Sequence, residues 1–551
     1  MQKQVRFIAA NAVFYFQTVC CCLTFCLFAT STHVAHAEHT KKPKPPNIVI
    51  VMADDMGYGD TQPYNAESKI KTPAFNRLAK EGVLFTDAHS GSAVCTPTRY
   101  GLVCGRYAWR TRLKQSVLFG YSEPLIDTDQ QTMGSVLRTA GYETACVGKW
   151  HLGLGWQGQD DAPKKTNQFG PFGSKHNRVD YSKPVTDGPT HHGFDYSYII
   201  PASLDMSPYV YIENDKVTAV PEAVVKQSPF PKFYRKGEKA PDFKIIGCLD
   251  HLTDKATDYI SEKAKTDKPF FLYFPMPAPH KPVIPTKKFQ GESKLGPYGD
   301  FIKQVDAAVG RVIDSIDEAG IAENTLFVYT SDNGSFMHSN ENKPDHVQDE
   351  KQQRYSPENH RANGALRGTK ADVWEAGHRV PFFVRWPKTI DGGKHCKKTI
   401  CHVDILATVC EITDAKFSRD LKKGAPDSYS FAGSLMDRFE ETKRPGVVNH
   451  SIGGMFAIRR GEYKLVLGNG SGGRAKPRGE NFGKPYQLYN LDKDLSETND
   501  ILQDHTEMAA ALEEELKSIG GDDIAWPKED ANEGEKKMEK SENKKQPETI
   551  K

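Results

Sequence analysis

Cys95 and Arg99 are the residues whose types and spacing first suggest chemistry in this chain. They stand four positions apart in the segment 95–99, with Pro97 between them. A helix that begins near Pro97 places Cys95 at its N-terminus, where unpaired backbone N–H groups favour an anion, and returns Arg99 to the same face. A reactive group, a fixed positive charge and a helix N-terminus predict chemistry on an oxyanion ester. A buried cysteine beside a surface arginine is the plainer alternative for this segment alone.

Oxygen-bearing side chains follow two apolar, β-branched runs that are typical of buried strands. These side chains are Asp54, Asp55, Asp332 and Asn333. In α/β sheets, ligands bind at the carboxyl ends of the strands. Adjacent carboxylates repel each other unless a cation lies between them. The four side chains therefore predict a site for a hard cation such as Ca²⁺ or Mg²⁺, over zinc. A solvated turn is the alternative at Asp54 and Asp55.

Lysines and histidines that could bind an anion and move protons follow two other predicted strands and also occur in a later loop. Lys149 and His151 are two apart, so both side chains face one side of an extended segment. Lysine supplies a point charge for a sulfate or phosphate oxygen, and histidine carries protons near neutral pH. His280 lies in a proline-rich loop that would hold it rigidly, as a general acid requires. Lys370 is a second candidate cation. A surface lysine or a structural histidine remains the alternative for each.

Short apolar strands and amphipathic helices alternate along most of the chain and must position these groups. The strands are expected at 47–53, 83–88, 142–147, 268–274, 325–331 and 382–386. The helices are expected at 72–82, 131–140, 251–264, 298–319 and 403–413. This alternation predicts an α/β fold with a large, mixed, mostly parallel sheet sandwiched by helices. After about residue 444, closely spaced short strands predict a smaller antiparallel sheet, followed by a helix near 506–518.

Length and composition suggest how the chain is divided. Its 551 residues are too many for one typical domain. We expect a signal peptide at 1–37, a linker at 38–46, a catalytic domain at 47–443, a C-terminal α+β subdomain at 444–527, and a disordered Lys/Glu-rich tail at 528–551. Two polar insertions, 155–189 and 335–362, have no role that can be assigned from the sequence.

The N-terminus has the pattern of an export signal. Lys3 and Arg6 precede an apolar run from 7 to 29, and small residues at 35–37 suit a cleavage site. An uncleaved anchor is the alternative, and no later stretch has the length or apolarity to span a bilayer. The 73 Lys and Arg nearly balance the 71 Asp and Glu, so nothing indicates nucleic acid or an anionic membrane as a partner.

The cysteine count also suggests a special role for Cys95. Four of the 11 cysteines lie in the signal region, which leaves seven. An odd number in an exported protein indicates that one is not a disulfide partner, and Cys95 is the natural candidate. Cys396 and Cys401 could pair, but the sequence does not fix the connectivity among Cys104, Cys146, Cys248, Cys396, Cys401 and Cys410.

The pentapeptide 95–99 resembles the C-x-P-x-R signature of the formylglycine-dependent sulfatases, in the alkaline phosphatase superfamily. The resemblance extends from residue 47 to about 501. It implies that Cys95 is converted to formylglycine by a formylglycine-generating enzyme and that Arg99 orients it. It also implies that Asp54, Asp55, Asp332, Asn333 and the modified Cys95 bind calcium, that Lys149 and Lys370 bind sulfate, and that His151 and His280 carry protons. Ala376 and Cys104 depart from the family pattern without removing a catalytic group.

The resemblance implies an arylsulfatase-like sulfuric ester hydrolase that acts on a sulfated small molecule or glycan, with a carbohydrate sulfate favoured as the natural substrate. A phosphodiester or phosphonate monoester hydrolase of the same superfamily is one alternative. A non-catalytic protein that binds sulfated glycans is another, although the chain keeps every catalytic group. The expected location is outside the cytoplasm, in a periplasmic, secreted or lumenal compartment.

Overall fold

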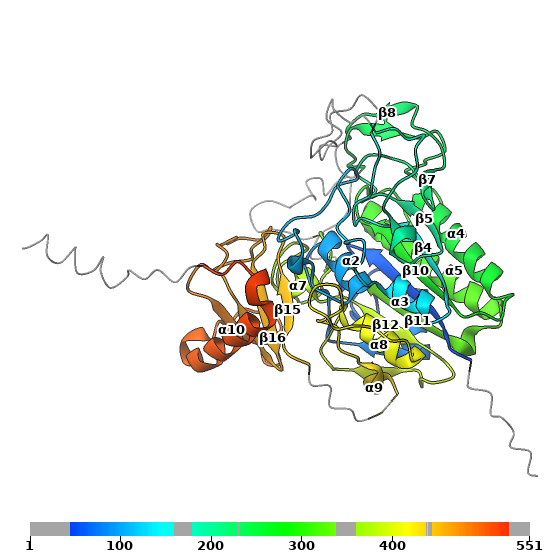
Figure 1. The fold of residues 1–551 in the computed structure, drawn as a ribbon. Helices are drawn as coiled ribbons and strands as arrows, with labels where there is room; N and C mark the ends of the chain where they lie inside the picture. The colour runs from blue at the N-terminus through cyan, green and yellow to red at the C-terminus, as the bar shows by residue number, and fades with distance from the viewer. Residues whose placement is uncertain are drawn as a thin grey trace, which may run out of the picture. The chain divides into compact units, whose positions relative to one another are not determined.

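A ten-stranded mixed sheet organises the computed structural model, which describes residues 44–158, 179–228, 232–337, 360–436, 438 and 444–527 (Figure 1). The strand order is β13-β2-β12-β11-β1-β10-β4-β5-β6-β7. The strands are β1 (Asn47–Asp54), β2 (Val83–Phe85), β4 (Glu143–Lys149), β5 (Tyr196–Ile200), β6 (Ile212–Glu213), β7 (Lys216–Val217), β10 (Phe270–Pro279), β11 (Thr325–Ser331), β12 (Phe382–Arg385) and β13 (Lys394–Cys396). The predicted α/β architecture is confirmed.

The centre of this sheet is β1, whose eight residues are all buried. It pairs in parallel with β10 on one side and with β11 on the other, and β10 pairs in parallel with β4. A parallel strand covered on both faces requires a nearly continuous apolar run, which explains the sequence of β1. Because the central strands are parallel, their carboxyl ends meet at one edge of the sheet. That edge carries the predicted site residues.

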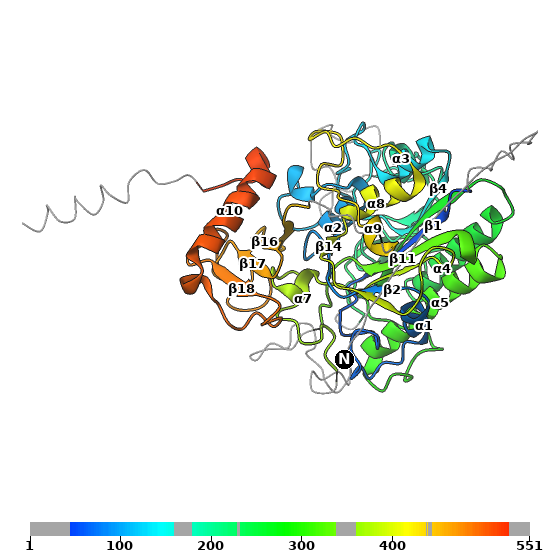
Figure 2. The same ribbon diagram turned by 90° about the horizontal axis from the view of Figure 1, so that it is seen from below.

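Helices cover both faces of the sheet (Figure 2). One face carries α1 (Pro73–Glu81), α4 (Cys248–Lys263) and α5 (Gly296–Glu318). The other carries α2 (Cys95–Cys104), α3 (Met133–Thr139), α8 (Asp404–Thr413) and α9 (Ala432–Leu435). In α5, Phe301, Val305 and Val312 lie on one buried stripe, as the apolar spacing predicted. No helix in the described part of the chain has the length and apolarity needed to cross a membrane.

A smaller antiparallel sheet follows, in the order β15-β16-β17-β18. Its strands are β15 (Val447–His450), β16 (Phe456–Arg460), β17 (Tyr463–Val466) and β18 (Gln487–Asn490), and α10 (Thr506–Gly520) contacts β16 and β17. Its apolar side chains share a core with Tyr107, Trp109 and Val403. The two sheets are therefore packed together through a common core. The division at residue 443 stays a prediction.

Two elements differ from the predicted ones. The expected strand at 83–88 is split into β2 and a short β3 (Ala88–His89), which pairs with β14 (Ile400–Cys401). The strand expected to end at 274 continues as β10 to Pro279. Up to Tyr273, β10 pairs with both β1 and β4, and beyond it β10 pairs with β1 alone. The prolines, which have no N–H to donate, therefore lie where β10 has one paired neighbour instead of two. The remaining strands, β8 (Ala223–Val225) and β9 (Gly237–Lys239), form a separate pair.

The seven cysteines in the described part of the chain are all unpaired. The odd count of cysteines therefore does not single out Cys95, whose special character has to be argued from its surroundings. The predicted signal peptide, the tail at 528–551 and much of both insertions lie outside the described residues.

Acid is expected to destabilise the fold through His450 on β15. Its Nδ1–H donates to the Ser451 carbonyl at 3.0 Å, and burial lowers its pKa to about 4. The unfolded chain binds a proton below pH 6.5 and the folded chain does not, so stability present above pH 6.5 is lost as pH falls. Between pH 7 and 5, the free energy of unfolding should fall by about 2 kcal/mol through His450.

Urea unfolding at both pH values tests this expectation. The loss of stability should be smaller in His450→Gln but unchanged in His191→Gln, which replaces an exposed histidine. An equal loss in His450→Gln would contradict the assignment.

Candidate active site

Cys95 is the first residue of α2 and is 2% exposed. Val94 before it is extended, and all ten helix residues are buried. Burial raises the pKa of the Cys95 thiol, and the nearby charges of Lys149 and Lys370 only partly oppose this. An unmodified thiol here is therefore protonated near neutral pH, whereas a cysteine nucleophile must be a thiolate. The surroundings favour an oxygen nucleophile at this position over a sulfur one.

Arg99 lies one turn along α2 and is fully buried. Its Nη2 and Nε donate to Asp332 Oδ2 at 2.7 and 3.1 Å, and its Nη1 donates to the Lys149 carbonyl at 3.1 Å. Nη2 also lies 3.7 Å from Asp54 Oδ1. The guanidinium therefore links the helix to the ends of β11, β4 and β1, which fixes the start of α2 against the sheet edge.

Two buried lysine–aspartate pairs lie at this edge. Lys149 Nζ donates to Asp54 Oδ2 at 2.6 Å, and Lys370 Nζ donates to Asp55 Oδ1. Burial alone would raise the pKa of Asp54, but Lys149 and Arg99 outweigh it and hold that pKa low. Burial and the neighbouring Asp54 raise the pKa of Asp55 against the opposing effect of Lys370. The charge of Asp55 in turn raises the pKa of Lys370 despite burial, so this lysine stays protonated.

The oxygens at this edge fit a hard cation. Asp54 Oδ1, Asp55 Oδ2 and Asn333 Oδ1 are buried, and within the described residues none has a hydrogen-bond partner. Buried polar atoms normally have such a partner, and a bound ion is one way to satisfy them. Asp332 lies among them, since its Oδ1 accepts from Asp55 N–H at 3.1 Å. Burial and the nearby Asp54 raise the pKa of Asp332, and a cation bound between these carboxylates would oppose that rise.

The two histidines are held by backbone carbonyls. His151 Nε2–H donates to the Leu118 carbonyl at 2.7 Å, which leaves Nδ1 without a hydrogen-bond partner in the described chain. Burial, and then the charge of Lys149, lower the pKa of His151 well below its usual range. The ring is therefore neutral, with an unprotonated Nδ1 that can accept a proton.

His280 follows β10, and its Nδ1–H donates to the Lys281 carbonyl at 2.6 Å. Its Nε2 lies 3.7 Å from Asp55 Oδ2, and one ligand atom from each of Asp54, Asp55 and His280 lies within 4.8 Å of the others. Burial and the charges of Lys370 and Lys149 lower the pKa of His280. The structure thus brings all ten predicted site residues to one sheet edge or its adjoining loops.

Three non-glycine residues at this edge have left-handed backbone. They are Asp55 (φ 69°), His151 (φ 57°) and Ala371 (φ 84°), the residue after Lys370. Such conformations are uncommon outside glycine and occur most often at functional sites. The expectation that Lys149 and His151 share an extended segment is wrong locally, because the chain turns at His151. The imidazole nevertheless stays close enough to Lys149 for the lysine charge to lower the pKa of His151.

Three charged residues beside His280 are not among the predicted site residues. Asp205 Oδ1 lies 3.8 Å from His280 Nδ1, and Asp205 is paired with Arg235. Lys281 is 6% exposed, and its Nζ lies 4.1 Å from the centre of the Phe233 ring. Its position between two prolines next to His280 was the available signal. The segment 232–235 has no motif that would have placed it here.

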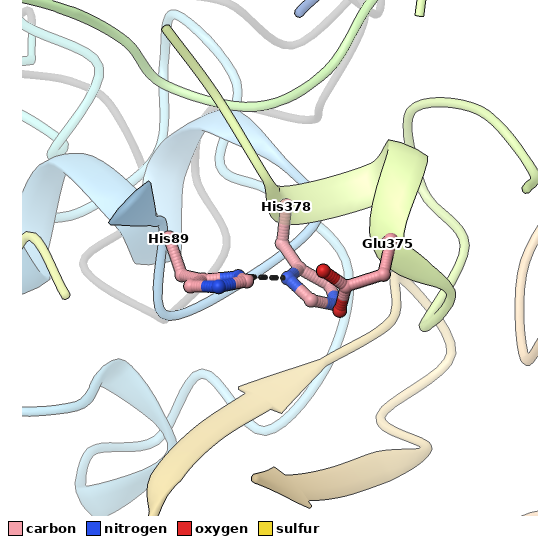
Figure 3. A group of neighbouring side chains, drawn as sticks. All are labelled: His89, Glu375 and His378. Carbon is pink, nitrogen blue, oxygen red and sulfur yellow. Dashed lines mark hydrogen bonds and ion pairs between the residues drawn. The ribbon is translucent and has the colours of Figure 1, made fainter. Parts of the chain in front are cut away.

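A second buried group, His89, Glu375 and His378, also has metal-ligand atoms close together (Figure 3). The Nδ1 atoms of the two imidazoles are 3.0 Å apart. Lys464 Nζ from β17 lies 3.0 Å from Glu375 Oε1 and 3.1 Å from His378 Nε2. This ammonium already gives Glu375 its positive partner and would repel a metal ion. The group therefore joins the C-terminal sheet to α7 (Glu375–His378), which follows the Lys370 loop.

Comparisons with known proteins agree with this geometry. A family model described as Sulfatase matches residues 46–415. An N-acetylgalactosamine-6-O-sulfatase of Bacteroides thetaiotaomicron is 32% identical, over 88% of this chain and 94% of the relative. Human arylsulfatase A is 27% identical, over 83% and 84% of the two chains. A solved structure described in terms of glycosaminoglycan metabolism by Bacteroides thetaiotaomicron is 31% identical, with a TM-score of 0.73 over 86% of this chain and 99% of the other.

Proposed function

The chain belongs to the sulfatase family, and on that premise we propose that it hydrolyses a carbohydrate sulfate ester through an oxidised Cys95 and a calcium site. It is a sulfuric ester hydrolase of the alkaline phosphatase superfamily. The observation that carries the finer proposal is the buried cluster of Asp54, Asp55, Lys149 and Lys370 around the start of α2. The 32% identical N-acetylgalactosamine-6-O-sulfatase supports a sugar sulfate as substrate.

The cation would be held by the side-chain oxygens of Asp54, Asp55, Asp332 and Asn333, together with the modified residue 95. These oxygens suit calcium, with magnesium as the second choice. When bound, such an ion supplies positive charge that stabilises the oxygens of the sulfate group. His280 lies beside these oxygens, but a hard cation prefers the carboxylates, which leaves the imidazole available for proton transfer.

Formation of the nucleophile requires oxidation of Cys95 to formylglycine by a formylglycine-generating enzyme. The hydrate of that aldehyde supplies one hydroxyl to attack sulfur and a second whose deprotonation expels sulfate. Arg99 fixes the position of residue 95 through its contacts with Asp332 and the Lys149 carbonyl. A single hydroxyl, as in serine, would leave an ester that water has to attack against the charge of the sulfate.

Lys149 and Lys370 neutralise the sulfate oxygens in this proposal, and both already lie at the site as ion-pair partners of carboxylates. The ammonium of Lys370 donates toward the departing alcohol oxygen, and the unprotonated Nε2 of His280 beside it can accept and pass on a proton, since Nδ1–H is committed to the Lys281 carbonyl. The neutral imidazole of His151 receives a proton at Nδ1, since Nε2–H is committed to the Leu118 carbonyl. The free ring nitrogen is Nδ1 in His151 and Nε2 in His280, so the two rings offer their proton-accepting atoms from different positions at the site.

The reaction class is tested with matched 4-nitrophenyl sulfate, 4-nitrophenyl phosphate and phenyl phosphonate esters. We expect kcat/KM for the sulfate to exceed the other two by about 100-fold, as the match to the sulfatase family over residues 46–415 implies. A preference for phosphate or phosphonate would overturn the proposal. Release of inorganic sulfate from a panel of sulfated saccharides, measured in parallel, identifies the sugar.

We further propose that residues 1–37 direct export, with cleavage after the small residues at 35–37. The test is the N-terminal sequence of the protein recovered from the extracytoplasmic fraction of cells that express the full chain.

A further inference from the structure

His89 and His378 form a pair of fully buried imidazoles outside the predicted catalytic residues (Figure 3). Their Nδ1 atoms are 3.0 Å apart, so one N–H···N hydrogen bond joins the two rings. Nε2 of His89 lies 2.8 Å from Asp87 Oδ1, and Nε2 of His378 lies 3.1 Å from Lys464 Nζ. The imidazole pair therefore connects a carboxylate just before β3 with an ammonium on β17.

The contacts at the two ends decide which ring nitrogens carry protons. Burial alone would raise the pKa of Asp87, but His89 and two arginines hold that pKa low, so the carboxylate is ionised and accepts Nε2–H of His89. Burial lowers the pKa of both histidines, so each ring is neutral and carries one N–H. His89 Nδ1 then accepts from Nδ1–H of His378, whose Nε2 accepts from Lys464. The other tautomers, with His378 Nε2–H directed at the Val373 carbonyl 3.0 Å away, would turn an unprotonated His89 Nε2 toward Asp87.

The imidazole pair joins two chain segments that reach the catalytic residues. We call residues 88–95, which end at Cys95, the nucleophile segment, and residues 370–378, which begin at Lys370, the lysine segment. Each segment contributes one of the two imidazoles. The hydrogen bond between the rings is thus a direct side-chain link between the segment that carries the nucleophile and the segment that carries a sulfate-binding lysine.

Backbone hydrogen bonds join the same two segments closer to the catalytic residues. Ser90 N–H donates to the His378 carbonyl at 2.8 Å, and Ala371 N–H donates to the Ala93 carbonyl at 2.8 Å. Ala371 has a left-handed backbone and directly follows Lys370, so its conformation sets the direction in which the lysine leaves the segment. The position of Lys370 relative to residue 95 therefore depends on how the two segments are held together.

The C-terminal sheet and the loop after β15 hold both segments from outside. Ala93 N–H donates to the His450 carbonyl at 2.9 Å, and Ile452 N–H donates to the Ala371 carbonyl at 2.9 Å. Lys464 belongs to the same sheet and is fully buried where it contacts the imidazole pair. The nucleophile segment, the lysine segment and the C-terminal sheet thus form one hydrogen-bonded network, and the imidazole pair is its link through side chains.

We propose that His378 is a positioning residue for the hydrolysis: its hydrogen bond to His89 holds Lys370 at the correct distance from residue 95. The inference rests on the proposed function, which assigns Lys370 to the sulfate oxygens. His378 acts through the two segments and does not touch the substrate. Displacing a catalytic group by about 1 Å can lower a rate by about 100-fold, so loss of one directional bond between the segments has a large effect.

Three substitutions at position 378 separate hydrogen bonding from packing. His378→Leu keeps a side chain of similar size but removes the bond to His89, and it should lower kcat/KM for 4-nitrophenyl sulfate about 100-fold. His378→Asn places an amide near the former Nδ1 and should recover about tenfold of that loss. His378→Gln places its amide near the former Nε2, toward Lys464, and should recover less than His378→Asn. Rates are normalised to the aldehyde content of residue 95, measured by peptide mass spectrometry.

A double-mutant cycle with Lys370→Met tests whether the effect passes through that lysine. His378→Leu should lower kcat/KM about 100-fold in the wild type but less than about fivefold in Lys370→Met, because a lysine that is absent cannot be displaced. His192→Leu is the matched control, since it removes a buried imidazole that is paired with Asp187. It should change kcat/KM by the same small factor in both backgrounds.

Three results would overturn the inference. They are equal losses from His378→Leu with and without Lys370, no recovery in a folded His378→Asn, and full activity of Lys370→Met. Circular dichroism establishes which variants fold, and His378→Gln replaces His378→Leu in the cycle if the leucine variant does not. In all three cases the wild-type enzyme still hydrolyses 4-nitrophenyl sulfate. Absence of that hydrolysis in the wild type would overturn the proposed function, and this inference with it.

Discussion

Replacing Cys95 by alanine is expected to reduce sulfate-ester hydrolysis by about 10⁴-fold or more, because it removes the nucleophile. The loss should appear in kcat measured with 4-nitrophenyl sulfate, while the substrate still binds through Lys149 and Lys370. Cys95→Ser should hydrolyse no more than traces and should gain the mass of one sulfuryl group, since one hydroxyl can accept sulfur but cannot expel sulfate. Peptide mass spectrometry of the region 86–99 should show an aldehyde at residue 95 in the active wild type.

Cys104→Ala is the matched control for Cys95→Ala. Cys104 is the last residue of the same helix and is also buried, and burial raises the pKa of its thiol too. Its removal should leave kcat within a few-fold of the wild type. Full activity of an enzyme whose Cys95 is an intact thiol would rule out the oxidised nucleophile.

Removal of the bound cation is expected to have the second largest effect. Treatment with EGTA should lower kcat by on the order of 10³-fold, because the charge that stabilises the sulfate oxygens is lost. Calcium should restore activity better than magnesium, since flexible oxygen ligands suit the larger ion. Calorimetric titration of the metal-depleted protein should show one calcium site that disappears in Asp55→Asn.

Asp187→Asn is the control for Asp55→Asn, because it removes a carboxylate that pairs with His192 instead of a site lysine. It should bind calcium like the wild type. Metal-depleted protein that keeps full activity, or Asp55→Asn that binds calcium normally, would contradict the assignment of these oxygens. Circular dichroism of the depleted protein distinguishes loss of the ion from loss of the fold.

Much of the site could be predicted because it lies at strand ends. Asp54, Lys149, His280 and Asp332 each end or follow a buried strand whose apolar run is visible in the sequence. Parallel strands then bring their carboxyl ends together without further information. Arg99 could be placed for a similar reason, since helical periodicity fixes residue i+4.

Other features depend on contacts that no local pattern encodes. Lys370 lies in a loop with no strand before it, and its position depends on left-handed Ala371 and on Asp372. Arg474 lies in a glycine-containing loop between β17 and β18, and it reaches the Lys370 segment through a tertiary contact, since its N–H donates to Asp372 Oδ1 at 2.6 Å. The cysteine argument failed because an odd count has meaning only if the other cysteines pair, and the six others in the described part of the chain are free.

The left-handed residues at Asp55, His151 and Ala371 have a consequence for how this enzyme can change over time. Each such conformation costs roughly 1–3 kcal/mol, and the surrounding structure must compensate. Selection for thermal stability alone would therefore favour glycine or relaxed loops at these three positions and would weaken the site. Variants that keep all three conformations must gain stability elsewhere, in the helices and in the second sheet. The number of mutations that the active site can accept on the way to a new substrate should thus depend on how stable the helices and the second sheet are.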